Sequence, residues 1–167
     1  MNTIIAKKYK LIYGDIFEYI EKNERDVDII VPHVCSTSGK FNTGFAAALS
    51  KKFPEVKLNY EILHAHKLGE NQKVKSNGKM FINMICQNGE PYKNNPRPLN
   101  YFCLVKCMAD VRHFIKNNYK DADIRRCQIH CPKFGVGSSG GNWNFISDLI
   151  EDVWADLDVF VYSYKRE

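Results

Sequence analysis

The stretch that decides the fold is Phe134-Gly-Val-Gly-Ser-Ser-Gly-Gly-Asn-Trp143, a glycine-rich loop between a strand-like segment and a helical pattern. A second loop of this kind, His33-Val-Cys-Ser-Thr-Ser-Gly-Lys-Phe-Asn-Thr-Gly44, follows an apolar run at residues 27–31. Glycines let backbone amides turn toward an anion, and the following helix N-terminus adds partial positive charge. Ligands of open α/β sheets bind beyond the carboxyl ends of strands, where such loops gather. Two facing loops would therefore bind a diphosphate.

The second loop by itself leaves other interpretations open. It contains Gly135-x-Gly137-x-x-Gly140, but a Rossmann fingerprint is expected near the first strand rather than near the C-terminus. The spacing of a P-loop is absent from it. A tight strand-to-helix turn without any ligand is the structural alternative.

The surrounding pattern alternates strands with helices. Asn77-Gly78 marks a tight hairpin turn between two strands, and Pro54 is expected to close a helix. The helix at residues 99–117 places Phe102, Val105, Met108 and Ile115 at three- to four-residue intervals. Strands are expected at residues 9–13, 27–31, 72–75, 79–86, 126–130 and 159–164, and helices at residues 16–22, 44–49, 61–67, 99–117 and 144–154. This alternation predicts one α/β domain over residues 1–167 with helices on both faces of the sheet.

Composition places the chain among ordinary globular domains. It has 167 residues, 44% of them hydrophobic and 26% charged, which suits a single core. No stretch approaches the roughly 18 apolar residues of a membrane span, and the short apolar run before Lys7 does not resemble a secretory signal. We expect a cytoplasmic monomer that does not bind membranes, in the host cytoplasm if the protein is viral.

The net charge and the cysteine spacing bear on two classes of function, the binding of an anionic ligand and the binding of a metal ion. The formal charge of +5 comes from scattered lysines, which suit a solvated surface or a phosphate-bearing ligand. The six cysteines include no Cys-x-x-Cys pair. Reduced, mostly buried thiols are therefore expected rather than a metal site, and no cofactor is predicted.

Several motifs in the right order resemble macro domains, the α/β modules that bind ADP-ribose. These are Gly14-Asp15-Ile16-Phe17, His33-x-Cys35, Thr43-Gly44-Phe45-Ala46, Asn83-Met84-Ile85-Cys86-Gln87 and residues 132–143. The resemblance covers about residues 13–162 and is strongest to the branch with terminal ADP-ribose glycohydrolases, DNA ADP-ribosyl antitoxins and phage ADP-ribose-1''-phosphate phosphatase-like proteins. It implies a three-layer α/β/α fold around a mixed sheet of about six strands.

The resemblance also implies binding roles. Asp15 would accept a hydrogen bond from the adenine amino group beside the Ile16 amide, although a capping role for Asp15 is the alternative. Ser36 corresponds to an asparagine that lies beside the distal ribose in many macro domains. The amides facing the phosphates and the distal ribose would belong to Thr43, Gly44, Phe45, Gly135, Val136, Gly137, Ser138, Ser139 and Gly140.

Two residues are candidates for catalysis. Lys75 stands where glycohydrolases of this branch carry a lysine nucleophile, and a solvated hairpin lysine is the alternative. His33 could protonate a leaving group, or it could be a structural histidine. Ser139 replaces an aspartate of the terminal ADP-ribose glycohydrolases, which removes a general base at that position.

Three functions follow from these residues. The first is metal-independent hydrolysis at the distal ribose of ADP-ribose-1''-phosphate or of ADP-ribose esterified to protein or nucleic acid. The second is binding of ADP-ribose or a related signalling nucleotide without turnover. The third is nucleic-acid binding through the basic surface, which the lack of interleaved aromatic and basic residues disfavours.

Overall fold

A six-stranded mixed sheet forms the centre of the molecule. The computed structural model describes residues 8–22 and 26–164. Neighbouring strands pair in parallel, except for the antiparallel β3–β4 pair. The strands, in the spatial order β1-β6-β5-β2-β4-β3, are β1 (Lys10–Tyr13), β6 (Asp158–Ser163), β5 (Cys127–Pro132), β2 (Asp28–Ser36), β4 (Lys79–Gln87) and β3 (Glu70–Ser76).

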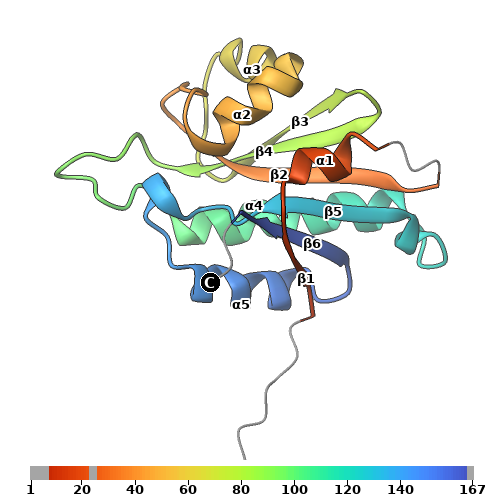
Figure 1. Ribbon diagram of the computed structural model, residues 1–167. Helices are drawn as coiled ribbons and strands as arrows, with labels where there is room; N and C mark the ends of the chain where they lie inside the picture. The colour runs from red at the N-terminus through yellow and green to blue at the C-terminus, as the bar shows by residue number, and fades with distance from the viewer. Residues whose placement is uncertain (1–7, 23–25, 165–167) are drawn as a thin grey trace, which may run out of the picture.

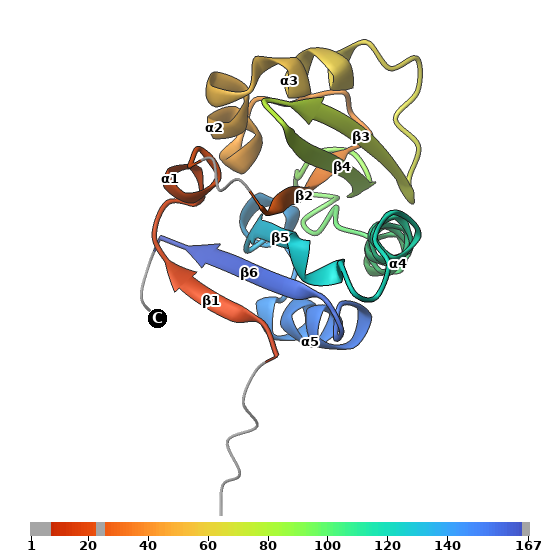
Figure 2. The same cartoon turned by 90° about the vertical axis from the view of Figure 1, so that its right-hand side faces the viewer.

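Helices cover both faces of this sheet (Figure 1 and Figure 2). One face carries α1 (Ile16–Ile20), α2 (Gly44–Lys52) and α3 (Pro54–Glu61). The other face carries α4 (Tyr101–Asn118) and α5 (Trp143–Val153). Each face buries its own hydrophobic cluster against the sheet. The expected three-layer α/β/α fold with six strands is therefore confirmed.

Two local predictions need correction, and one is confirmed. The helix expected at residues 61–67 is wrong, because α3 ends at Glu61 and turns follow it. The prediction that Pro54 closes a helix is confirmed, because α2 ends at Lys52; Pro54 also begins α3 at its first turn, where the missing N–H costs nothing. Phe102 is 82% exposed, although its spacing suggested the buried face of α4. The face of α4 that is buried consists of Leu104, Cys107, Met108, Val111 and Ile115.

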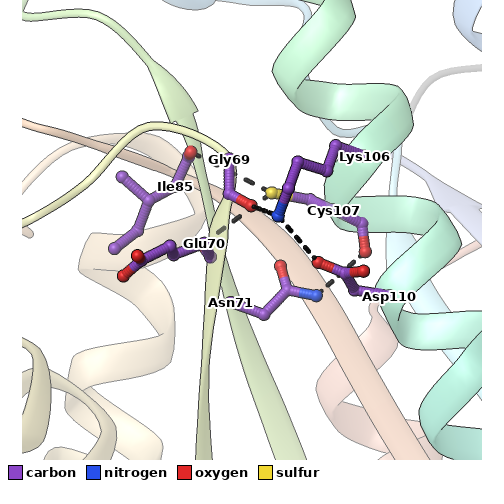
Figure 3. A network of polar contacts seen from close by, with 7 residues as sticks. All are labelled: Gly69, Glu70, Asn71, Ile85, Lys106, Cys107 and Asp110. Atoms are coloured by element: carbon purple, nitrogen blue, oxygen red, sulfur yellow. Dashed lines mark hydrogen bonds and ion pairs between the residues drawn. The ribbon is translucent and has the colours of Figure 1, made fainter.

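The predicted hairpin is present, and a polar network anchors its first strand (Figure 3). The Lys106 ammonium on α4 donates to the Gly69 carbonyl at 2.7 Å and pairs with Asp110 at 3.2 Å. The amide nitrogen of Asn71 donates to the Cys107 carbonyl at 2.9 Å. These contacts fix the start of the edge strand β3 on α4, so the register of the hairpin is set at its open end.

The cysteines are free thiols, and all but Cys103 are buried. The described residues contain no helix that is long and apolar enough to cross a membrane. Among those same residues, no group of three or more histidine, cysteine or acidic side chains is placed to hold a metal ion.

Candidate functional site

A pocket lies where the two predicted loops face each other at the carboxyl ends of β2 and β5. These neighbouring parallel strands bring the loops together across the sheet edge. Ten of the predicted site residues line the pocket: His33, Ser36, Thr43, Gly44, Phe45, Gly135, Val136, Gly137, Ser138 and Ser139. The geometry therefore brings most of the predicted site together.

The first wall of the pocket includes the N-terminus of α2. The N-cap residue Thr43 makes no side-chain capping hydrogen bond, and the first turn contains no acidic side chain. The first backbone N–H groups of a helix have no partner within the helix. Those of Gly44 and Phe45 are thus available to an anion, which the positive end of the helix also attracts.

The second wall is the glycine-rich loop after β5. Its turns are closed by backbone hydrogen bonds from Gly140 to the Gly137 carbonyl and from Gly141 to the Gly135 carbonyl. A short 3₁₀ segment over Gly137–Ser139 lies between them. The loop is therefore held in a fixed shape that presents successive backbone amides to the pocket.

A cluster of polar side chains closes one end of the pocket. The Ser139 hydroxyl donates to the side-chain oxygen of Gln87 at 2.7 Å. The Gln87 amide nitrogen donates to the Gly89 carbonyl at 3.0 Å, and the Ser36 hydroxyl donates to the same carbonyl at 2.7 Å. This cluster ties the ends of β2 and β4 to the glycine-rich loop.

Charged side chains also line the pocket. Lys40 and Lys133 are the cations, and Glu90 is the carboxylate. The Ser38 hydroxyl donates to Glu90 Oε1 at 2.5 Å. Sequence reasoning missed Gln87 as a site residue and did not consider Glu90. The polar ending of the apolar run 79–87 was the available signal, because a ligand site is expected beyond the end of such a strand.

His33 is buried in the wall rather than exposed in a loop, because β2 continues to Ser36. Its ring is 1% exposed and packs edge-on against Phe41 and Phe45. Burial lowers the pKa of His33 to about 4, against the raising effect of its hydrogen bond to Asn83. At neutral pH the imidazole is uncharged, so it has no imidazolium proton to give to a leaving group. The predicted general-acid role does not fit this site.

A ladder of hydrogen bonds across three strands fixes the tautomer of His33. Its Nε2 lies 2.5 Å from Asn83 Oδ1, and Asn83 Nδ2 donates to Gln72 Oε1 at 3.0 Å. Because the Asn83 nitrogen faces Gln72, its oxygen accepts from His33, which assigns the proton to Nε2. The Nδ1 atom is then an acceptor.

Asp15 lies beside the pocket rather than in its wall. Its Oδ1 accepts from the Phe17 amide at 2.9 Å and from the Tyr164 hydroxyl at 3.2 Å. The Phe17 ring stacks on Phe45 of the pocket wall, with ring centroids 5.6 Å apart. Asp15 thus caps α1, and α1 contacts the pocket wall through Phe17. In the sheet, β1, which leads into α1, lies on the other side of β5 and β2 from β4, which ends at Gln87 of the polar cluster. The side chain of Ile16 is buried in the core.

Lys75 and Gly140 do not line the pocket. Lys75 is exposed and pairs with Met80 at the start of β4, whereas the pocket contacts Gln87 at its end. A strand segment of that length spans roughly 20 Å, and Figure 1 shows the hairpin at the far end of the sheet. The predicted nucleophilic role of Lys75 does not fit, whereas a solvated hairpin lysine does. Gly140 packs against the backbone of Arg97 instead.

Similar folds are found among solved structures. A protein of unknown function from Bacteroides thetaiotaomicron superposes with a TM-score of 0.78 at 25% identity, over 94% of this chain and 98% of its own. A macrodomain protein from Streptomyces coelicolor superposes with a TM-score of 0.70 at 22% identity, over 94% of this chain and 99% of its own. The protein has a macro-domain fold. DarTG of Thermosipho africanus, solved in complex with ADP-ribose, superposes on this chain with a TM-score of 0.65 at 17% identity, over 94% of this chain and 42% of its own.

Two curated proteins are similar to this chain in sequence. An uncharacterised 17.5 kDa protein of Enterobacteria phage T4 is 23% identical over 163 residues, 93% of this chain and 96% of its own length. An ADP-ribose 1''-phosphate phosphatase of Candida albicans is 25% identical over 149 residues, 84% of this chain and 90% of its own length. No family model matches this chain.

Proposed function

We propose that this macro domain binds ADP-ribose in the pocket and hydrolyses a substituent on its distal ribose, without a metal ion. The observation that carries the binding proposal is the pair of facing amide-lined loops, one of which continues into the N-terminus of α2. A diphosphate needs several hydrogen-bond donors converging on it from two sides. The cations Lys40 and Lys133 in the same pocket add charge of the required sign.

The two ends of the pocket suggest the orientation of the ligand. Adenine would lie toward Asp15 and Phe45, because the Asp15 carboxylate can accept from its amino group through Oδ2 while Oδ1 caps α1. The distal ribose would then lie toward the polar cluster of Ser36, Gln87 and Ser139. The phosphates would contact the amides of residues 44–45 and 135–138.

Hydrolysis is the finer part of the proposal. It is supported by the relative named ADP-ribose 1''-phosphate phosphatase, and we propose ADP-ribose 1''-phosphate as the first substrate to test. ADP-ribose esterified to protein or nucleic acid is the second. Nucleic acid enters this proposal only as the carrier of the modification.

Binding without turnover is the competing function. It is favoured by Ser139, whose hydroxyl is already engaged with Gln87 and which stands where glycohydrolases carry an aspartate. A neutral His33 and a remote Lys75 point the same way. Turnover measurements separate the two functions, because both predict the same affinity for ADP-ribose.

The binding test is a calorimetric titration of the protein with ADP-ribose, for wild type and for Asp15→Ala. We expect micromolar affinity in the wild type and a loss of about tenfold or more in the variant, as for a lost hydrogen bond to a charged group. Asp121→Ala is the matched control, because Asp121 is exposed and lies beyond the opposite ends of the strands. Equal affinity in all three proteins would refute the adenine site, and no heat in the wild type would refute ADP-ribose binding.

A further inference from the structure

Hydrolysis needs a group that takes a proton from water, and few residues in the pocket wall can do so. Cys35 is 4% exposed, and burial raises its pKa well above the ordinary value. His33 is enclosed by Phe41 and Phe45. The lysines lining the pocket suit phosphate oxygens rather than proton abstraction. Glu90 is the carboxylate among the lining residues that the structure describes, and it is partly open to solvent.

The backbone before Glu90 is fixed at the end of the pocket that holds the polar cluster. The Gly89 carbonyl accepts from both Ser36 and Gln87, and the Gly89 amide donates to the Thr37 hydroxyl at 2.9 Å. Three hydrogen bonds to the backbone of one residue leave little freedom in where residue 90 begins. The backbone of Glu90 therefore begins beside Ser36 and Gln87, where the proposed function places the distal ribose.

The carboxylate itself is oriented by the first loop. The Ser38 hydroxyl donates to Oε1 at 2.5 Å, and within the described part of the chain no donor contacts Oε2. The Ser38 hydroxyl oxygen in turn accepts from the Lys40 amide at 3.2 Å. One carboxylate oxygen is thus positioned by Ser38, while the other can accept a hydrogen bond from a water molecule in the pocket.

We propose that Glu90 is the general base of this site, an inference that rests on the proposed hydrolase function. Glu90 takes a proton from a water molecule while the water oxygen forms a bond to the phosphorus of ADP-ribose 1''-phosphate. The bond between phosphorus and the anomeric oxygen breaks, and its electron pair goes to that oxygen. The anomeric oxygen takes a proton from solvent, which gives ADP-ribose and inorganic phosphate. Glu90 then returns its proton to solvent.

Lys40 supplies a positive charge beside Glu90 for this step. Lys40 follows Ser38 in the first loop and lines the same pocket, so its ammonium can contact the terminal phosphate. Such a cation offsets the repulsion between the Glu90 carboxylate and an anionic substrate. Ser38 is a positioning residue, because it acts on the reaction through Glu90.

The test compares wild type, Glu90→Gln and Glu61→Gln, each as the full chain. The release of inorganic phosphate from ADP-ribose 1''-phosphate is followed as a function of pH, and ADP-ribose affinity is measured by calorimetry. We expect Glu90→Gln to lower kcat about a hundredfold or more while KM changes by less than about threefold. Glu61 is exposed on α3 and forms an ion pair with Lys57, away from the pocket, so its substitution is expected to leave kcat unchanged.

Ser38→Ala provides a second readout. We expect it to lower kcat by about tenfold while KM changes by less than about threefold, because the hydrogen bond that orients Glu90 is lost. A residue that only supported the fold would lower the amount of active protein and leave kcat per active molecule unchanged.

The possible results distinguish a failure of the role of Glu90 from a failure of the proposed hydrolase function. Turnover by Glu90→Gln within about threefold of wild type would overturn the role of Glu90 and leave the hydrolase proposal standing. ADP-ribose binding by wild type without phosphate release would overturn the phosphatase reaction and the role of Glu90 together. In that case the binding proposal would remain, and the absence of binding heat would overturn that as well.

Discussion

At the scale of single residues, the decisive feature is which polar groups around the pocket already have hydrogen-bond partners. Gln87 is buried, yet both polar atoms of its side chain have partners, Ser139 and Gly89. The hydroxyl of Ser139 therefore has a structural role, at the position where terminal ADP-ribose glycohydrolases carry an aspartate. This leaves the carboxylate of Glu90, on the next loop, as the reactive group of that end of the pocket.

The hydrogen bond between Ser139 and Gln87 predicts the effect of Ser139→Ala. The substitution leaves the Gln87 side-chain oxygen buried without a donor, so the free energy of unfolding should fall by about 1–3 kcal/mol. Urea denaturation measures the change. The neighbouring Ser138 is exposed, and Ser138→Ala should change the free energy of unfolding by less than about 0.5 kcal/mol. Similar losses in the two variants would show that the hydrogen bond to Gln87 contributes little.

At the scale of elements, the glycine-rich loop is set by one close approach. A Cβ on Gly141 would lie 2.3 Å from the Gly135 carbonyl oxygen and 2.6 Å from a methyl of Leu99. The two ends of the loop therefore touch through a position where any side chain would force them apart. Since Leu99 also donates its amide to the Ser139 carbonyl, the loop is packed against the segment that enters α4.

The close approach predicts unequal effects of two alanine substitutions in the same loop. Gly141→Ala should lower the free energy of unfolding by about 3 kcal/mol, because backbone atoms must shift. Gly137→Ala meets no atom within 4 Å and has only the strain of φ +66° to bear, so about 1 kcal/mol is expected. Chemical denaturation of both variants checks the order, and a larger loss for Gly137→Ala would contradict it.

At the scale of the whole molecule, two buried histidines link stability to pH. Burial lowers the pKa values of His33 and His130 to about 4. In the unfolded chain a histidine binds its proton near pH 6.5. As the pH falls from about 7 to about 4, the unfolded state is therefore protonated first and becomes relatively more stable. Each histidine should reduce the free energy of unfolding by about 3 kcal/mol over this range.

Urea denaturation at pH 7, 6 and 5 measures this loss. In His130→Gln the dependence on pH should be about half as steep, because His33 alone remains. Glutamine can keep a hydrogen bond to the Tyr162 hydroxyl, which lies 2.7 Å from the His130 ring, so the fold should be retained. An unchanged slope would mean that the pKa of His130 in the folded protein is the same as in the unfolded chain.

The sequence by itself determined the features that depend on neighbouring residues. The Asn77-Gly78 turn, the two loops with their following helices and the alternation of strands and helices were all readable, because turn chemistry and periodicity are local. The same locality explains two errors. Residues 61–67 have the composition of a helix but form turns in which Ile62 is 73% exposed. Phe102 has helical spacing but lies two residues before the buried Leu104, on the opposite side of α4.

Only the tertiary structure decided which side chains share the pocket. The antiparallel pairing of β3 places Lys75 beside the start of β4, far from Gln87, and no local pattern specifies that register. The parallel pairing of β2 with β4 and β5 brings Ser36, Gln87 and Ser139 together from distant parts of the chain and buries His33 on the way. Contacts of this kind depend on long-range strand pairing and on the packing of each helical layer. Local patterns in the sequence do not specify the individual contacts.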